Sequence, residues 1–212
     1  MRVVLASNNR GKLSELSAML DALPLELVAQ AELGVDEAEE TGTTFVENAI
    51  IKARHAALAC GLPAMADDSG LVVPALAGAP GVRSARYAGP HADDAANRER
   101  LLAAMRTLSG PARACHFVCV MVYLRHADDP LPLIASGTWH GHVLAAPRGS
   151  GGFGYDPLFG LDDATSGAAC SAAELPPREK NRRSHRGQAV RALVAALTAE
   201  LGGAPSALTV AD

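Results

Sequence analysis

The sequence lacks a basic excess, long apolar runs and any regular spacing of cysteines. Its formal net charge of −4 argues against a nucleic-acid-binding surface, because such domains usually carry excess lysine and arginine. No apolar run approaches the roughly 20 residues of a membrane-spanning helix, and the apolar residues at the N-terminus stop after Ala6, too early for a signal peptide. The four cysteines match neither a disulfide framework nor a zinc-knuckle spacing. We therefore expect a cytoplasmic protein that binds no nucleic acid and no membrane.

Lysine is scarce as well. The chain has sixteen arginines but only three lysines, Lys12, Lys52 and Lys180. Since arginine supplies most of the positive charge, the remaining lysines are expected where a compact ammonium with three donors is needed. Phosphate oxygens around a metal ion make that demand, and chance is the alternative explanation.

The spacing of apolar residues predicts strands that alternate with helices. Residues 2–6 predict a strand, and leucines recur at helical spacing over residues 13–23. The polar turn between them, residues 7–12, would aim backbone N–H groups and the positive end of a helix dipole at whatever lies above the strand. Further strands are predicted at residues 25–29, 63–66, 71–73, 113–126, 131–139 and 140–146, further helices at 44–60, 93–108 and 184–201, a polar turn at 67–70 and a surface loop at 162–173.

These elements predict an α/β fold around a mixed sheet. One domain is expected over residues 1–201, followed by a loose tail at residues 202–212. The helix at residues 44–60 has a clear start, because Thr44 and Glu47 stand at capping-box spacing. One stripe of this helix carries polar residues at intervals of four and three: Asn48, Lys52 and His55.

Acidic residues in two predicted loops are candidate metal ligands. Glu40 ends the acidic loop at residues 36–40, and Asp67 and Asp68 begin the polar turn. Carboxylates are the hard oxygen ligands that Mg²⁺ prefers, and one or two suffice when substrate phosphates complete the coordination. A carboxylate beside a metal-bound water could also remove its proton. The alternatives are a solvated acidic loop and, for Asp67, a simple turn.

Two other motifs are less specific. The glycine-rich residues 149–157 lack the lysine and hydroxyl residue of a P-loop, so a permissive turn explains them equally well. Cys115, His116 and Cys119 invite a zinc interpretation. However, the two cysteines share one face of an apolar, β-rich run, and small buried side chains explain them better.

Seven segments occur in one particular order along the chain. They lie at residues 7–12, 39–42, 44–53, 66–71, 78–87, 151–157 and 184–187. This order resembles the inosine triphosphate pyrophosphatase family, whose bacterial members are called dITP/XTP pyrophosphatases. The resemblance covers residues 2–201, and all three lysines fall inside or beside the matching segments.

The resemblance implies a fold, a reaction and an assembly. The fold would be a long bent mixed sheet flanked by helices, with two lobes around a central cleft, usually in a homodimer. The reaction would be Mg²⁺-dependent hydrolysis of non-standard purine nucleoside triphosphates, such as those of inosine, deoxyinosine and xanthosine, to the monophosphate and pyrophosphate. Such hydrolysis keeps deaminated purines out of DNA and RNA.

Roles for individual residues follow from the same resemblance. Glu40 and Asp68 would hold Mg²⁺, and Asp68 would be the base for the attacking water. The triphosphate would be bound by Ser7, Asn8, Asn9, Arg10, Gly11, Lys12, Lys52 and Lys180, with Ser69 against the substrate. The base and sugar would be lined by Phe153, Gly154, Tyr155 and Asp156, with Phe153 as a stacking platform, and the purine edge would be read by His185 and Arg186.

Reading of the purine edge has a chemical rationale. Donors on His185 or Arg186 can meet the 6-oxo group of inosine or xanthosine, but they would face another donor in adenine. This does not explain how guanine, which also has a 6-oxo group, is refused. The ranking among inosine, deoxyinosine and xanthosine triphosphates stays open, as does the choice between Asp67 and Asp68 as the residue that touches the metal.

Two departures from the family pattern and two alternatives accompany this hypothesis. The loop between Phe159 and Glu174 is somewhat expanded, which affects the geometry leading to Lys180, and Asn8 stands where many relatives have glycine. One alternative is a Maf-like nucleotide pyrophosphatase, although its serine-proline-arginine-arginine turn is absent after Ala6. The other is a sensor that binds nucleotides without turning them over.

Overall fold

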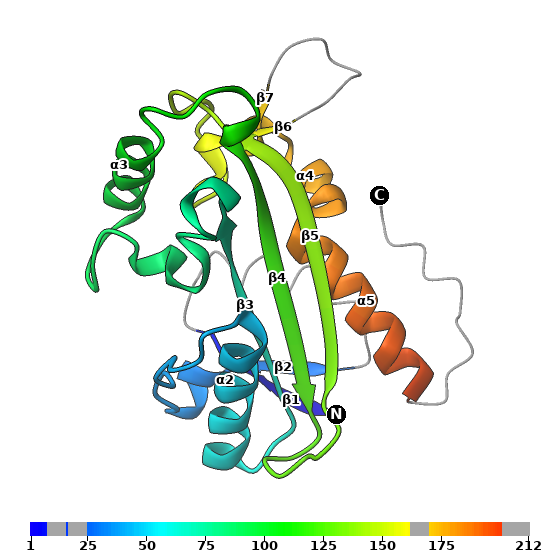
Figure 1. Ribbon diagram of the computed structural model, residues 1–212. Coiled ribbons are helices and arrows are strands. Elements are labelled where there is room, and N and C mark those ends of the chain that lie inside the picture. The colour runs from blue at the N-terminus through cyan, green and yellow to red at the C-terminus, as the bar shows by residue number, and fades with distance from the viewer. Residues whose placement is uncertain (8–15, 17–24, 162–169, 201–212) are drawn as a thin grey trace. The chain divides into compact units, whose positions relative to one another are not determined.

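The computed structural model describes residues 1–7, 16, 25–161 and 170–200 (Figure 1). Within these ranges one mixed sheet has the strand order β2-β1-β3-β4-β5-β6-β7. The strands are β1 (Arg2–Leu5), β2 (Glu26–Ala29), β3 (Ala64–Val72), β4 (Ala114–Leu124), β5 (Leu133–Val143), β6 (Phe159–Leu161) and β7 (Cys170–Ser171). The α-helices are α2 (Phe45–Cys60), α3 (Asp94–Ala104), α4 (Pro177–Arg183) and α5 (His185–Glu200). The 3-10 helices are η1 (Gln30–Leu33), η2 (Pro74–Leu76), η3 (Gly81–Arg86), η4 (Gly110–Arg113), η5 (Asp156–Leu158) and η6 (Ala172–Glu174).

The sheet combines parallel and antiparallel pairs. β1 runs parallel to both β2 and β3, whereas β6 runs antiparallel to both β5 and β7. The prediction of an α/β fold around a mixed sheet is therefore confirmed. No helix in the described part of the chain is long and apolar enough to cross a membrane.

The chain divides into two compact units. Unit 1 takes its described residues from Met1–Asp68, Cys119–Gly137 and His185–Asp212, and unit 2 consists of Ser69–Val118 and Thr138–Ser184. The long strands β3, β4 and β5 each contribute residues to both units. The expected bend of the sheet and the expected central cleft depend on how the two units are arranged. Both therefore stay predictions.

Each unit has its own hydrophobic core. In unit 1, apolar side chains of β1, β3 and β4 pack against α5, as in the cluster of Leu5, Met65, Met121 and Leu193. Helix α2 buries four alanines, Ala49, Ala53, Ala56 and Ala57, whose small side chains allow close packing. In unit 2, the core gathers large side chains including Leu101, Phe117, Trp139 and Phe159.

Three predictions about local structure are wrong. Residues 67–70 form no turn, because β3 runs without a break from Ala64 to Val72. β5 likewise continues through residue 143, so the separate strand at 140–146 does not exist. Its Gly141 lets β6 lie close, since an added Cβ would collide with the Gly160 carbonyl and the Phe159 ring.

The third error concerns the surface loop at residues 162–173. Residues 162–169 lie outside the described residues, but Cys170–Ser171 forms β7 and Ala172–Glu174 forms η6. Ser171 and Glu174 make a capping box, which is a sequence signal that the small, polar composition of this segment obscured. Helix α4, which has a proline at its start, was not predicted either.

Candidate functional site

A lysine and two carboxylates form the first cluster, which lies in unit 1. Lys52 Nζ of α2 lies 2.8 Å from Glu40 Oε1 and 3.1 Å from Asp68 Oδ1. The exposed fractions of these side chains are 14 % for Lys52, 21 % for Glu40 and 7 % for Asp68. One ammonium therefore joins a loop carboxylate to a strand carboxylate in a largely shielded position.

The start of α2 holds this cluster in place. The predicted capping box is present, with Thr44 and Glu47 satisfying each other's backbone N–H groups. In the next turn, Asn48 accepts a hydrogen bond of 2.8 Å from the Gly42 N–H and reaches Asp68 Oδ2 at 3.4 Å. Asn48 thus ties the end of the acidic loop to β3.

Gly42 is required where it stands. A Cβ added there would lie 2.6 Å from Glu47 Cβ and 2.7 Å from Asn48 Oδ1, closer than real Cβ atoms come. The loop that carries Glu40 can approach α2 only because this side chain is missing.

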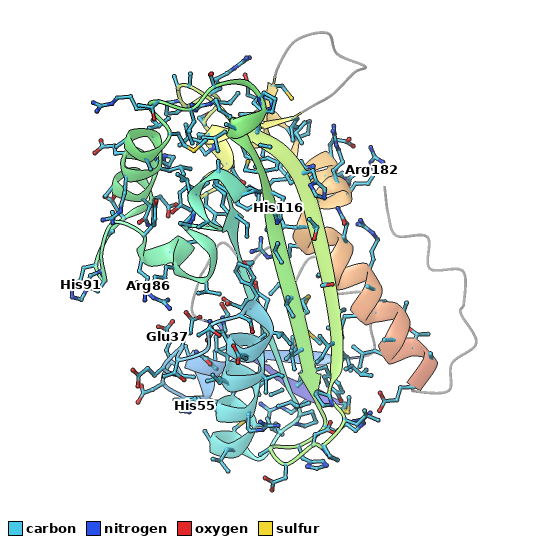
Figure 2. All side chains as sticks on the ribbon, viewed as in Figure 1. Glu37, His55, Arg86, His91, His116 and Arg182 are labelled. Carbon is cyan, nitrogen blue, oxygen red and sulfur yellow. The ribbon has the colours of Figure 1, made fainter. Side chains whose placement is uncertain are left out.

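His55 makes a second contact between α2 and the acidic loop. Its Nε2 atom lies 3.0 Å from the Asp36 carbonyl oxygen, and Figure 2 labels His55 together with Glu37 of the acidic loop.

The electrostatics of the cluster keep Lys52 protonated. Burial alone would lower the pKa of Lys52, but the negative charges of Asp68, Asp67 and Glu40 outweigh it and raise the pKa above the ordinary lysine value.

A position that stabilises one cation between two hard oxygen donors also suits a hard divalent ion. No group of three or more His, Cys, Asp and Glu residues able to hold a metal gathers anywhere in the described ranges. One or two carboxylates are enough for such an ion when phosphates complete its coordination.

Asp67 belongs to a different environment from Asp68. Its Oδ2 atom lies 3.7 Å from Arg186 Nη2 and 4.0 Å from Cys119 Sγ. The side chains of Asp67 and Arg186 are 0 % and 3 % exposed. Asp68 therefore pairs with the lysine that also contacts Glu40, whereas the carboxylate of Asp67 lies nearer Arg186 and acts on Lys52 only through its charge.

Arg186 stands in the first turn of α5, whose start packs closely on β5. A Cβ on Gly137 would collide with the His185 carbonyl and lie 2.8 Å from the Ala189 N atom. His185 is buried as well. Because Gly137 has no side chain, the start of α5 can lie against β5 with His185 and Arg186, the two residues expected to contact the purine edge.

The second cluster lies in unit 2, on the glycine-rich segment. Asp156 Oδ2 accepts a hydrogen bond of 2.9 Å from the Phe153 N–H and lies 2.9 Å from Lys180 Nζ of α4. Lys180 Nζ also stands 4.9 Å from the centre of the Phe153 ring. Gly152 has φ of 69°, and a Cβ there would collide with the Asp156 carboxylate. The glycine-rich segment is therefore a defined turn, fixed by the hydrogen bond and the ion pair of Asp156.

Several predicted site residues have other surroundings. Tyr155 is buried in the core of unit 2, where its hydroxyl donates to the Ser84 carbonyl at 2.8 Å, and burial raises the pKa of this phenol. Ser7 follows β1, Ser69 lies within β3, and both are partly exposed. Asn8, Asn9, Arg10, Gly11 and Lys12 lie outside the described residues.

Sequence reasoning missed two residues that hold the glycine-rich segment. Asp94 Oδ2 accepts a hydrogen bond from the Gly154 N–H at 2.6 Å, and Arg98 Nη1 donates to the Gly154 carbonyl at 2.8 Å. No local pattern could have found them, because more than fifty residues separate each from its partner.

The interpretation of Cys115 and Cys119 as buried core residues is confirmed.

Two solved structures with this fold are of Ham1 proteins. A HAM1 protein from Coxiella burnetii is 48% identical, with a TM-score of 0.85 over 94% of this chain and 99% of that one. The Staphylococcus aureus Ham1 protein is 37% identical, with a TM-score of 0.81 over 94% of this chain and 100% of that one. The family model described as the Ham1 family matches residues 3–196.

The chain therefore belongs to the Ham1 family. Two similar proteins carry the name dITP/XTP pyrophosphatase. The one from Halorhodospira halophila is 56% identical over 96% of this chain and 100% of its own length. The one from Pectobacterium atrosepticum is 55% identical over 92% of this chain and 98% of its own length. The resemblance recognised in the sequence is confirmed.

Proposed function

We propose that the protein hydrolyses dITP, ITP and XTP to the corresponding monophosphate and pyrophosphate. The observation that carries this proposal is the contact of Lys52 with both Glu40 and Asp68, which gathers two carboxylates and one ammonium within hydrogen-bond distance. Membership of the Ham1 family and the names of the relatives support the substrate class. Residues 1–201 would form one pyrophosphatase domain.

Glu40 and Asp68 would hold Mg²⁺. The ion, when bound, supplies positive charge against the triphosphate and makes a bound water more acidic. The fit rests on the donor set: two hard carboxylate oxygens already face one shared cation. Asp67 is left out of this pair, because its carboxylate faces Arg186.

Within unit 1, the chain's own groups divide the work of hydrolysis. Asp68 orients the attacking water and accepts its proton, a task for a carboxylate fixed by Lys52 and Asn48. Lys52 carries a permanent positive charge, since its pKa is raised, and it offsets the charge of the phosphates as pyrophosphate leaves. The triphosphate is also bound by Ser7, Asn8, Asn9, Arg10, Gly11 and Lys12, and Ser69 lies against it.

Other residues recognise the nucleoside. In unit 2, Phe153 stacks on the base, Gly154, Tyr155 and Asp156 shape the base and sugar site, and Lys180 adds positive charge. In unit 1, His185 and Arg186 read the purine edge. Donors at that edge would donate to a 6-oxo group but would face another donor, the amino group, in adenine. A buried polar group left unpaired in this way is how a site rejects a near-isostere.

The enzyme would work in the cytoplasm, where the nucleotide pool that it cleanses feeds nucleic-acid synthesis, and the family resemblance implies that it would be a homodimer. The test of the function is to incubate the protein and Mg²⁺ separately with inosine, adenosine and guanosine triphosphates and to quantify monophosphate, pyrophosphate and orthophosphate. Conversion of inosine triphosphate to monophosphate and pyrophosphate, with the other two spared, is expected. Orthophosphate release or equal use of all three would refute the assignment, and intact nucleotide would favour a sensor.

A further inference from the structure

The residue after the proposed stacking platform is held on both sides by one helix. The Gly154 N–H donates to Asp94 Oδ2 at 2.6 Å, and the Gly154 carbonyl accepts from Arg98 Nη1 at 2.8 Å. Asp94 and Arg98 stand one turn apart on α3 and so lie on the same side of the helix. Both hydrogen bonds involve an ionised side chain, which makes them stronger than bonds between neutral groups.

On its other side, Phe153 is held by unit 2's buried ion pair. Its N–H donates to Asp156, whose carboxylate lies 2.9 Å from Lys180 Nζ. The segment is therefore attached both before and after the Phe153 side chain, and the buried Tyr155 fixes the backbone beyond Gly154. Losing the α3 attachment would leave the contacts of Phe153 and Tyr155 in place and loosen only the peptide groups of Gly154.

Helix α3 is itself firmly attached to unit 2. Asp93 caps its start by accepting from the Ala96 N–H at 2.8 Å, and Leu101 is fully buried in the core. Asn97 accepts from the Ala88 N–H at 2.8 Å and donates to the Ala85 carbonyl at 3.0 Å. A fixed helix can impose its geometry on a loop, whereas a loose one could not.

We propose that Asp94 and Arg98 are positioning residues that hold Phe153 in its stacking geometry and so set the affinity for the nucleoside part of the substrate. The proposal rests on the proposed function, because it assumes that Phe153 meets the base. A loop that is already ordered binds its ligand without the cost of ordering it. The phosphate groups and the water-activating carboxylate lie on other residues, so the pair governs substrate binding more than the rate of cleavage.

The experiment compares Asp94→Ala and Arg98→Ala with a matched control, Glu99→Ala. The control removes an exposed carboxylate from the same helix and leaves both the Asp93 cap and the Gly154 contacts in place. Three experiments are made: amide hydrogen exchange of Gly154 by NMR, steady-state kinetics giving KM and kcat for inosine triphosphate, and inhibition by inorganic tripolyphosphate, which has no base. Asp94→Asn and Arg98→Lys are the rescue variants, since each keeps one group able to make the hydrogen bond.

For Asp94→Ala we expect faster exchange at Gly154 and a KM about tenfold higher, as loss of one charge-assisted bond would give, with kcat changed less than twofold. Arg98→Ala should raise KM in the same way, the rescue variants should lie between, and tripolyphosphate inhibition should not change. A KM that rises equally in Glu99→Ala, or an unchanged Gly154 exchange, would overturn the positioning role. Absence of turnover in the unmodified protein would instead overturn the proposed function, and this role with it.

Discussion

Asp67 and Asp68 are consecutive residues of β3, yet their carboxylates contact different helices: Asp68 meets Lys52 of α2, and Asp67 faces Arg186 of α5. Successive side chains of a strand point to opposite faces of the sheet, so one backbone segment presents two carboxylates to two environments. The sequence left open which aspartate would touch a metal. Because Glu40 shares Lys52 with Asp68, the geometry favours Asp68.

The first prediction separates these two aspartates by their kinetics. Asp68→Asn keeps the size of the side chain but loses the basic oxygen, so kcat for inosine triphosphate should fall by about 10²–10⁴-fold with a much smaller change in KM. Asp67→Asn should retain more turnover for each folded molecule, because its carboxylate faces Arg186. Steady-state kinetics with the folded fraction measured by circular dichroism would check this. Equal losses of kcat in the two variants would contradict the assignment of the base.

A second prediction concerns stability. Asp67→Asn removes the negative charge that faces the buried guanidinium of Arg186, and breaking a buried pair on one side costs up to about 3–5 kcal/mol of unfolding free energy. Urea unfolding would measure the loss, with Asp36→Asn in the exposed acidic loop as the control. In the double variant Asp67→Asn/Arg186→Gln, part of that loss should be recovered. A loss no larger than that of Asp36→Asn would mean that other groups stabilise the guanidinium.

Much of the fold could be predicted from local signals. Helix α2 begins at the predicted capping box and ends before Gly61, because both limits are set by neighbouring residues. The start of α3 behind Asp93 follows from the same chemistry. The continuity of β3 could not be predicted, because its two aspartates are stabilised in a buried strand by Lys52 and Arg186, which lie far away in the sequence.

The candidate site was likewise predictable in part from the sequence. The scarcity of lysine singled out Lys52 and Lys180, and both are largely shielded from solvent beside carboxylates. Which carboxylates they meet depends on strand pairing and helix docking, neither of which leaves a local pattern. The attachment of Gly154 to α3 is a further case, since Asp94 and Arg98 look like ordinary surface charges in the sequence.

The third prediction tests the close approach of the acidic loop to α2. Gly42→Ala should push Asn48 and Glu47 away, disturb the position of Glu40, and cost about 1–3 kcal/mol, as overpacking does. Turnover should fall together with stability. The control is Gly34→Ala, where nothing lies within 4 Å of an added Cβ and only the backbone conformation, with φ of 68°, opposes the change. That variant should lose stability by a similar amount, about 1–2 kcal/mol, but keep its turnover.

Comparison of kcat and melting temperature for the two glycine variants would decide the matter. If Gly42→Ala had normal kcat at a temperature where it is fully folded, the loop would have room to move without affecting Glu40. The role of the missing side chain in building the cluster would then be refuted.

The fourth prediction concerns pH and the turn between β4 and β5. The carboxylate of buried Asp129 accepts from the Arg125 N–H at 3.0 Å, the Leu131 N–H at 2.9 Å and the Arg125 guanidinium at 2.8 Å. Burial alone would raise the pKa of Asp129, but these donors together hold it below the ordinary value of 3.8. A carboxyl whose pKa is depressed by folding adds stability above its unfolded pKa, and this stability is lost as the pH falls through the folded pKa.

Asp129→Asn should therefore destabilise the protein by about 1–3 kcal/mol at neutral pH, as loss of buried hydrogen bonds to a charged group does. The difference from the unmodified protein should stay constant down to about pH 5 and shrink below the ordinary value of 3.8, where the native carboxyl also becomes protonated. Urea unfolding at a series of pH values would measure it, with exposed Asp128→Asn as the neighbouring control. A difference that persisted unchanged at low pH would show that the oxygen positions of Asp129, and not its charge, stabilise the turn.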